Sequence, residues 1–160
     1  MCQGRGIYLT RRFDEVDLKS GDQLVAQRYM ARPYLIDDLK FDLRIYVLVY
    51  GVDPLRIFMF KEGLARFATE AYTGPAKTNL DNLYMHLTNY AINKNGANFV
   101  KNSDVDDDSG TKRTLTTVLD HIAEQDPNFD KENMIDQIED ICVKTCIAVQ
   151  PALSHAYRTS

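Results

Sequence analysis

The chain has 160 residues, of which 44% are hydrophobic and 26% are charged, a composition typical of a globular domain with a core of its own. Its 19 basic and 23 acidic residues give a formal net charge of -4, which argues against a surface built to bind nucleic acid or an anionic membrane. No apolar run approaches the roughly 20 residues of a membrane-spanning helix, and the first residues lack the apolar core of a signal peptide, so we expect an intracellular protein.

The first part of the chain is expected to be extended. Gly4-Arg5-Gly6, followed by apolar residues, predicts a turn that enters a strand over residues 4–12. A second turn is predicted at residues 20–22. Residues 31–34 are expected to be extended chain, because Pro33 disfavours helix both at its own position and at the residue before it.

A β-hairpin is predicted between residues 43 and 61. Two β-rich runs, LRIYVLVY and LRIFMFK, flank the turn residues Gly51-Val52-Asp53-Pro54. Alternate residues of the first run point to opposite faces of a strand, and both faces are largely apolar. Such a strand is typical of a sheet that is covered on both sides or that faces a ligand cleft.

Residues 69–100 are rich in Gly, Asn, Pro and Thr and show no periodicity, so we expect a long structured loop with short strands. The acidic stretch 103–110 is expected to be a solvated connection, because it lacks the glycine and the closing glutamate of an EF-hand calcium loop.

Apolar stripes then predict two helices, one over residues 115–122 and one over residues 134–149. Asp126-Pro127-Asn128 separates them, Asp130 is the expected N-cap of the second, and Pro151 is expected to end or kink it. Cys142 and Cys146 lie on the second stripe and, with Cys2, are expected to be reduced thiols. Strands followed by helices indicate an α+β or α/β fold.

Lys40, Asp42 and Arg44 recur at every second position of a predicted strand and therefore share one face. Desolvating three charges is costly unless they are paired or meet a ligand, which leaves two interpretations, an internally paired edge-strand face and a ligand site. Arg66 is a lone cation in an apolar stretch, where it either binds a ligand or bonds loop carbonyls.

Two further segments suggest a polar ligand. The glycines around Arg5 would let the backbone approach an anion, although this pattern is more often a plain turn. Residues 86–94 are dense in hydrogen-bonding side chains and predict either a ligand site or a self-satisfied turn. No Ser/His/Asp or Cys/His nucleophile set accompanies them, so the expected chemistry is electrostatic positioning of phosphates and carboxylates.

Five motifs occur in order over residues 2–100, namely CQGRGI, QRY followed by PYLI, KFDLRIYVLV, EGLARFAT and HLTNYAINK. Together they resemble the tubulin tyrosine ligase-like family, and in particular its tubulin polyglutamylases. The resemblance implies an α+β, ATP-grasp-like fold with an antiparallel or mixed sheet and C-terminal helices, in which two subdomains clamp ATP. It also implies that residues 1–160 form one partial catalytic domain that is truncated at both ends.

The resemblance also implies roles for individual residues. The implied ATP contacts are Gln3, Gly4, Gln27, Arg28, Tyr29, Met30, Lys40, Phe41, Asp42, Thr88 and Asn89, with residues 27–30 forming a hinge strand whose backbone reads adenine. Arg66, Tyr90 and Lys112 are implied to bind the incoming amino acid, with Arg66 on its carboxylate. Arg5, where the acceptor chain and the phosphates approach each other, and Arg66 are the candidate catalytic residues.

The resemblance implies an ATP- and Mg²⁺-dependent ligase that joins glutamate to tubulin carboxylates through an acyl-phosphate. Glutamate is favoured over glycine, because the two cations Arg66 and Lys112 suit a substrate with two carboxylates. The family's magnesium ligands are expected beyond Ser160 and its phosphate-loop lysine before Met1, so we expect no turnover by this chain alone. Nucleic acid and membrane are not expected partners.

The implied location is the cytoplasm and cytoskeleton, including cilia, flagella or basal bodies. Two alternatives remain: a non-catalytic microtubule- or tubulin-binding fragment or pseudoenzyme, and a family member that adds glycine or tyrosine.

Overall fold

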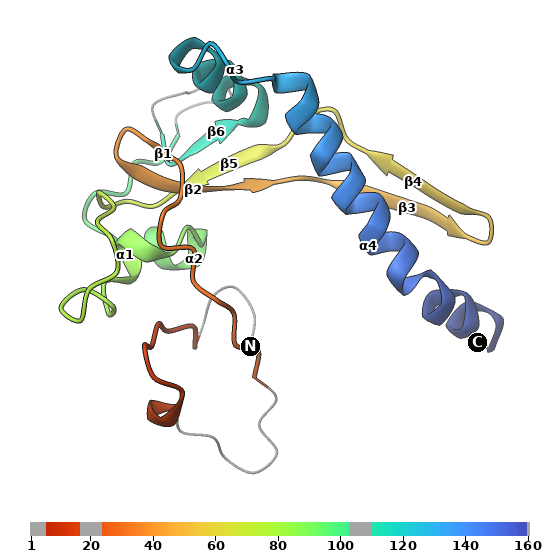
Figure 1. Ribbon diagram of the computed structural model, residues 1–160, viewed down its shortest axis with the longest axis horizontal. Helices are drawn as coiled ribbons and strands as arrows, with labels where there is room; N and C mark the ends of the chain where they lie inside the picture. Colours follow the sequence, from red (N-terminus) through yellow and green to blue (C-terminus); the bar gives the residue numbers. More distant parts are fainter. Residues whose placement is uncertain (1–5, 17–23, 103–109, 160) are drawn as a thin grey trace. The chain divides into compact units, whose positions relative to one another are not determined.

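Strands occupy the middle of the described chain and helices its last part (Figure 1). The computed structural model describes residues 6–16, 24–102 and 110–159. In chain order the elements are η1 (Phe13–Glu15), β1 (Leu35–Ile36), β2 (Leu39–Arg44), β3 (Val47–Val52), β4 (Leu55–Met59), β5 (Leu64–Phe67), α1 (Leu83–His86), α2 (Tyr90–Asn93), β6 (Lys112–Thr114), α3 (Leu115–Gln125) and α4 (Lys131–Thr159). The α+β prediction is therefore confirmed. Contacts divide the chain into two units, residues 1–42 with 66–102 and residues 43–65 with 103–160.

Strands β1, β2, β5 and β6 form a sheet in that order. β1 and β2 pair antiparallel, with Ile36 opposite Leu39. The two residues between them, Asp37 and Asp38, have φ values of 53° and 58°, the left-handed conformation that a tight two-residue hairpin turn requires and that Asp tolerates. This hairpin was not predicted from the sequence, and it fixes where β2 begins and hence where Lys40 and Asp42 lie.

The predicted hairpin between residues 43 and 61 is confirmed as β3 and β4, which pair antiparallel with Leu48 opposite Phe58. Its boundaries differ from the prediction. Residues 43–50 are not one strand, because β2 ends at Arg44 and β3 begins at Val47, and the turn is shorter because Gly51 and Val52 belong to β3. The register shifts between Val49 and Gly51, which marks a β-bulge.

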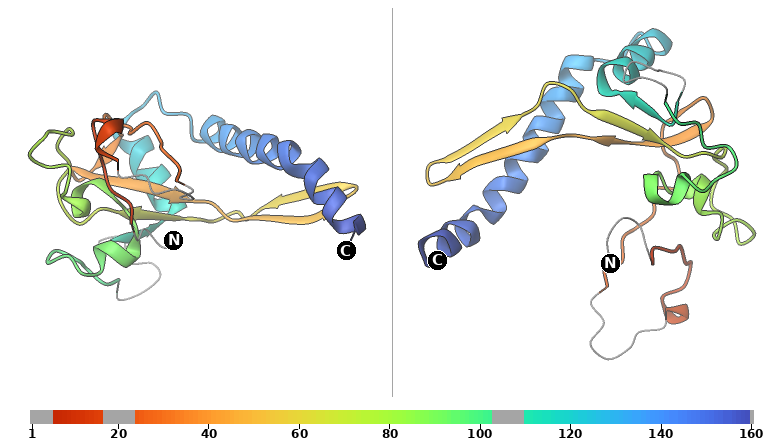
Figure 2. Two further views of the ribbon diagram at one scale, coloured as in Figure 1. Left: turned by 90° about the horizontal axis from the view of Figure 1, so that it is seen from below. Right: turned by 180° about the vertical axis from the view of Figure 1, so that it is seen from behind.

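Helix α4 lies against this hairpin (Figures 1 and 2). The Gln150 side-chain amide donates to the Val52 carbonyl at 2.8 Å, and Arg158 forms an ion pair with Asp53. The sequence predicted either coverage of both faces or a face toward a ligand cleft. Coverage of both faces is not found within the described residues, because Leu48 and Phe58 remain 59% and 57% exposed. The less exposed residues of β4 alternate with exposed ones, as expected for a sheet covered on one face.

The two predicted C-terminal helices are confirmed. Leu115, Val118 and Leu119 form the buried stripe of α3. Asp130 caps α4, because its carboxylate accepts from the Asn133 N–H at 2.9 Å. Pro151 does not end α4, which continues to Thr159, although the last part of the helix changes direction (Figure 2). Proline removes one backbone hydrogen bond there, and the contacts of α4 with the hairpin on either side of Pro151 hold the helix together.

Glu62 anchors the start of α3 from the loop after β4. Its carboxylate accepts from the Thr116 N–H at 3.1 Å, the Thr116 hydroxyl at 2.7 Å and the Gly63 N–H at 2.8 Å. A carboxylate at a helix N-terminus satisfies backbone donors that the helix itself leaves open. A larger residue would not fit at position 63, because a Cβ there would lie 2.7 Å from the Arg44 carbonyl oxygen.

Three predictions of extended structure are wrong. Residues 7–12 form no strand, and Ile7 and Tyr8 are 45% and 55% exposed, so they lack the packing that would hold a strand. Residues 27–30, the expected hinge strand, are not part of a strand either. Residues 69–100 contain the short helices α1 and α2 instead of short strands. The predicted turn at residues 20–22 and almost all of the acidic connection 103–110 lie outside the described residues.

No helix within the described ranges is long and apolar enough to cross a membrane.

Candidate active site

Asp42 on β2 and Arg66 on β5 form a bidentate ion pair. Arg66 Nε donates to Asp42 Oδ1 at 3.0 Å and Arg66 Nη2 donates to Asp42 Oδ2 at 2.6 Å. The side chains are 19% exposed for Arg66 and 36% exposed for Asp42. The planar guanidinium matches a carboxylate in this geometry, so both side chains are held in one orientation. For Asp42 this agrees with the interpretation of an internally paired strand face, although β2 lies between β1 and β5 and is not the predicted edge strand.

The pairing leaves part of the Arg66 guanidinium for other acceptors. A guanidinium has five N–H donors, and the contacts with Asp42 use one on Nε and one on Nη2. The edge formed by Nη1 and Nη2 keeps the same fork geometry for a second carboxylate. Among the described residues, the hydrogen bonds of the Arg66 side chain go to Asp42 and not to loop carbonyls, which was the structural alternative for this residue.

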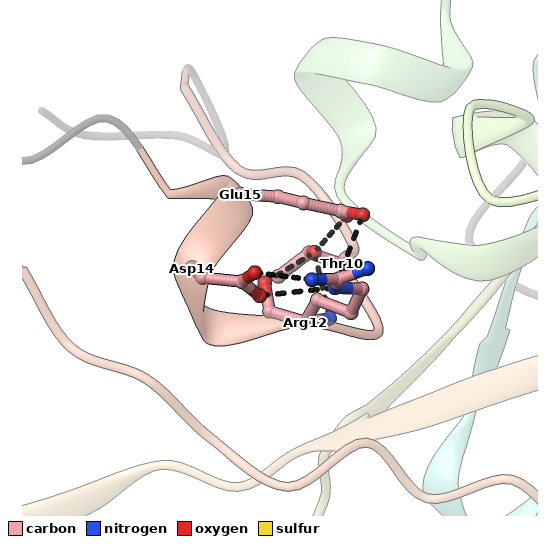
Figure 3. Close-up of polar contacts among 4 residues, drawn as sticks. All are labelled: Thr10, Arg12, Asp14 and Glu15. Carbon is pink, nitrogen blue, oxygen red and sulfur yellow. Dashed lines mark hydrogen bonds and ion pairs between the residues drawn. The ribbon is translucent and has the colours of Figure 1, made fainter.

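An exposed pair near η1 provides a contrast. Arg12 also contacts an aspartate, Asp14, through two nitrogens, and Thr10 and Glu15 complete the cluster (Figure 3). Here the partners are two residues apart and their side chains are 65% and 64% exposed. The Arg12 guanidinium lowers the pKa of Asp14. Such local pairs contribute little to stability, whereas Asp42 and Arg66 join two strands that are 24 residues apart.

Lys40 on β2 is held from two directions. Its ammonium group donates to the backbone carbonyl of His86 at 2.8 Å and to the Tyr29 hydroxyl at 3.2 Å. The nitrogen also lies 4.4 Å from the centre of the Tyr29 ring. Burial lowers the pKa of Lys40, and the charge of Asp42 partly offsets this effect. These contacts place a half-buried cation in one defined position.

The polar segment 86–94 is partly a self-satisfied turn. The Asn93 side chain is 2% exposed, accepts from the Thr69 N–H and hydroxyl at 3.1 and 2.9 Å, and donates to the Leu87 carbonyl at 2.7 Å. It also donates to the Asn89 carbonyl at 3.2 Å, so its hydrogen-bonding capacity is used internally. Asn93 therefore holds the backbone on either side of Thr88, one of the predicted ATP contacts.

The other predicted contacts lie in different settings. Thr88 and Asn89 are half-buried, and Tyr90 is 45% exposed with its ring edge against Phe99. Phe41 is half-buried and stacks on the buried Phe67 at 5.3 Å between ring centres. In the predicted hinge segment, Gln27, Arg28 and Met30 are exposed and Tyr29 is half-buried. Lys112 is half-buried on β6. Gln3, Gly4, Arg5 and Cys2 lie outside the described residues.

The sequence did not predict that His86 is buried or that its backbone carbonyl accepts from Lys40. It is fully buried, and the only signals were its position between the apolar residues Met85 and Leu87 and its place in a polar motif. Within the described ranges, no group of three or more His, Cys, Asp or Glu side chains is arranged to hold a metal ion.

The sequence matches the Tubulin-tyrosine ligase family over residues 1–160. Over 99% of its length it is 49% identical to the tubulin polyglutamylase ttll6 of Danio rerio and 50% identical to a probable beta-tubulin polyglutamylase of Tetrahymena thermophila. It is 47% identical to the tubulin polyglutamylase TTLL6 of Homo sapiens, again over 99% of the chain. It covers 19%, 13% and 17% of these proteins, so it spans less than a fifth of each. With a match over its whole length, the chain belongs to the tubulin-tyrosine ligase family and carries α+β elements of that family's ATP-grasp-like fold.

Proposed function

We propose that the full-length protein is an ATP-dependent ligase that adds glutamate to side-chain or chain carboxylates of tubulin. The observation that carries this proposal is the identity of 47–50%, over 99% of the chain, with relatives named tubulin polyglutamylases. Microtubules would be its partner, and the cytoskeleton, including that of cilia, flagella or basal bodies, its location.

The proposed reaction has two steps. The tubulin carboxylate attacks the γ-phosphorus of ATP, the bond to the β,γ-bridging oxygen breaks, and ADP leaves. The glutamate amine then attacks the acyl-phosphate carbon, an amide bond forms, and inorganic phosphate leaves with the amine giving up a proton. Phosphoryl transfer of this kind depends mainly on positioning and on compensation of negative charge.

Lys40 suits the role of a nucleotide contact. Two of the three N–H donors of its ammonium group are used by His86 and Tyr29, so the cation is fixed before ligand binding while one donor remains for a phosphate oxygen. A charge that is already oriented stabilises a developing negative charge without further reorganisation. We further propose Gln3, Gly4, Gln27, Arg28, Tyr29, Met30, Thr88 and Asn89 as contacts around the same nucleotide.

Arg66 suits the carboxylate of the incoming amino acid. Asp42 orients the guanidinium through Nε and Nη2, and the Nη1/Nη2 edge can bind a carboxylate with two parallel hydrogen bonds. Asp42 would therefore serve the amino-acid side of the reaction through Arg66, in addition to its proposed nucleotide contact. Tyr90 and Lys112 are proposed as further amino-acid contacts, and Arg5 as a group near the acceptor.

A direct assay tests this function. The full-length protein is incubated with microtubules, ATP and one labelled amino acid at a time. Incorporation of labelled glutamate with release of ADP is the expected result. Incorporation of glycine or tyrosine without glutamate would replace the substrate, and microtubule binding without any incorporation would favour a non-catalytic binding protein.

A further inference from the structure

His86 lies at the end of α1 with no exposed surface. Its ring contacts the edges or faces of two tyrosines, Tyr29 at 5.4 Å and Tyr72 at 6.0 Å between ring centres, with interplanar angles of 87° and 85°. Because no atom of the ring is accessible, His86 cannot itself contact a nucleotide in this conformation. Any contribution to ligand binding has to pass through the residues that it touches.

The hydrogen bonds of the His86 ring fix its tautomer. Nε2 lies 3.0 Å from the Asn79 carbonyl oxygen, which only accepts, so Nε2 carries the hydrogen. Nδ1 lies 2.8 Å from the Tyr29 hydroxyl and, being unprotonated in this tautomer, accepts its hydrogen. Burial, together with the charge of Lys40, lowers the pKa of His86, in agreement with a neutral ring.

The directions of these bonds lead to Lys40. Since the Tyr29 hydroxyl gives its hydrogen to His86, its oxygen is oriented to accept from the Lys40 ammonium group at 3.2 Å. The His86 backbone carbonyl accepts from the same ammonium group at 2.8 Å. Burial, with the neighbouring Tyr72, also raises the pKa of the Tyr29 phenol, which keeps the donated hydrogen in place. His86 thus holds Lys40 both directly and through Tyr29.

We infer that His86 is a positioning residue for nucleotide binding, which fixes Lys40 and the segment around Tyr29 relative to each other. This inference rests on the proposed function, since it takes Lys40 and residues 27–30 to contact ATP. If His86 only stabilised the fold, replacing it would weaken the binding of ATP and of glutamate equally. A positioning histidine affects ATP more than glutamate, and does so through the Nδ1 side of its ring.

Two conservative variants separate the two sides of the ring. The side-chain amide of asparagine in His86→Asn reaches the Nδ1 position, where its oxygen accepts from Tyr29, but it loses the bond to Asn79. Glutamine in His86→Gln reaches the Nε2 position and keeps the bond to Asn79 but loses the acceptor for Tyr29. Tyr29→Phe removes the hydroxyl that joins His86 to Lys40. Asn82→Ala is the control, since it removes a 2.7 Å bond to Glu70 beside α1 without touching this network.

The experiment measures binding of a non-hydrolysable ATP analogue by calorimetry, KM for ATP and for glutamate, and melting temperature, all on the full-length protein. We expect His86→Gln and Tyr29→Phe each to weaken analogue binding by about tenfold, because the first releases the orientation of the Tyr29 hydroxyl and the second removes that hydroxyl, and in both cases the charged Lys40 group loses an oriented acceptor. His86→Asn should bind nearly as tightly as wild type, and the double variant Tyr29→Phe/His86→Gln should be no weaker than either single variant, because both break one chain of contacts.

Several results would overturn the inference. They are equal weakening by His86→Asn and His86→Gln, equal increases in the KM of ATP and glutamate, and a loss of analogue affinity in Asn82→Ala as large as in His86→Gln. Unchanged affinity in His86→Gln would overturn it as well. Failure of the wild-type protein to bind the analogue is a different outcome, because it removes the proposed function itself.

Discussion

Replacing Asp42 by Asn tests whether the pair with Arg66 orients the amino-acid site. Asn keeps the size of the side chain but offers one neutral acceptor oxygen in place of two charged ones, so it loses the two parallel hydrogen bonds that Asp42 receives from Nε and Nη2 of Arg66. Hydrogen bonds to charged groups contribute about 1.5–3 kcal/mol, and exposed ion pairs about 0.2–1 kcal/mol. Since Arg66 is 19% exposed and Asp42 36%, we expect a loss of about 1–2 kcal/mol in the free energy of unfolding.

Loss of the same contacts should also weaken glutamate binding. A released guanidinium has to be ordered again when the substrate carboxylate binds, so KM for glutamate should rise by about 5- to 30-fold, the equivalent of that free energy. Urea unfolding and steady-state kinetics on the full-length protein measure the two effects. Asp14→Asn is the matched control, because it breaks a similar arginine pair that is exposed and local, and it should change neither quantity measurably.

Two results would refute this reasoning. Equal stability of Asp42→Asn and Asp14→Asn would show that the 2.6 and 3.0 Å bonds of Asp42 add nothing beyond an exposed pair. A rise in KM for ATP with an unchanged KM for glutamate would show that Asp42 acts only on the nucleotide side.

The remaining predictions concern separate contacts. Arg66→Ala should reduce glutamate use by about one to two orders of magnitude, the effect of losing a bidentate charged pair, with nearly unchanged ATP affinity, whereas Lys40→Ala should do the reverse; equal loss of ATP binding in both would remove Arg66 from the amino-acid site. Gly63→Ala should destabilise by about 1–3 kcal/mol in urea unfolding, because its Cβ would lie 2.7 Å from a backbone oxygen, while Gly74→Ala, with no atom within 4 Å, should be neutral. Burial acts to raise the pKa of Glu62, but the hydrogen bonds from Gly63 and Thr116 outweigh burial, so the pKa in the folded protein is lowered. The ionised Glu62 therefore stabilises the fold above its unfolded pKa of about 4.3, and this stabilisation is lost as the pH falls through the lower folded pKa. The difference in unfolding free energy between wild type and Glu62→Gln should therefore shrink on acidification, and a constant difference would contradict this assignment.

Local signals predicted the elements that depend on neighbours in sequence. The β3–β4 hairpin followed from β-branched and aromatic runs around a turn, and α3 and the start of α4 followed from apolar periodicity and capping residues. The β1–β2 hairpin was missed because its strands are only two and six residues long and its turn residues are two aspartates without a glycine. The helices α1 and α2 were missed because four residues are too few for a helical period to appear.

The sequence pointed to individual candidate residues, whose ligand contacts stay predictions, but not to the contacts that these residues make with one another. Alternation along one strand placed Lys40 and Asp42 on one face, and motif resemblance singled out Arg66. Neither could reveal that Asp42 pairs with Arg66 or that Lys40 binds the His86 carbonyl, because these contacts span 24 and 46 residues and depend on the packing of β2 against distant segments. The three-charge pattern left pairing and ligand binding open; the structure shows the pairing of Asp42, and ligand binding stays a proposal.

Lys40 and Arg66 share one physical arrangement. Each cation donates two hydrogen bonds to described residues of the protein. One of the three N–H donors of Lys40 and three of the five of Arg66 are left over from these contacts, so each cation is oriented and can still donate to a ligand. The conformational cost of ordering these long side chains is therefore met during folding and does not recur when a ligand binds. Removing a holding residue such as Asp42 or His86 should consequently weaken ligand binding even though the cation itself remains, while a variant of an exposed, local pair such as Arg12 and Asp14 should not.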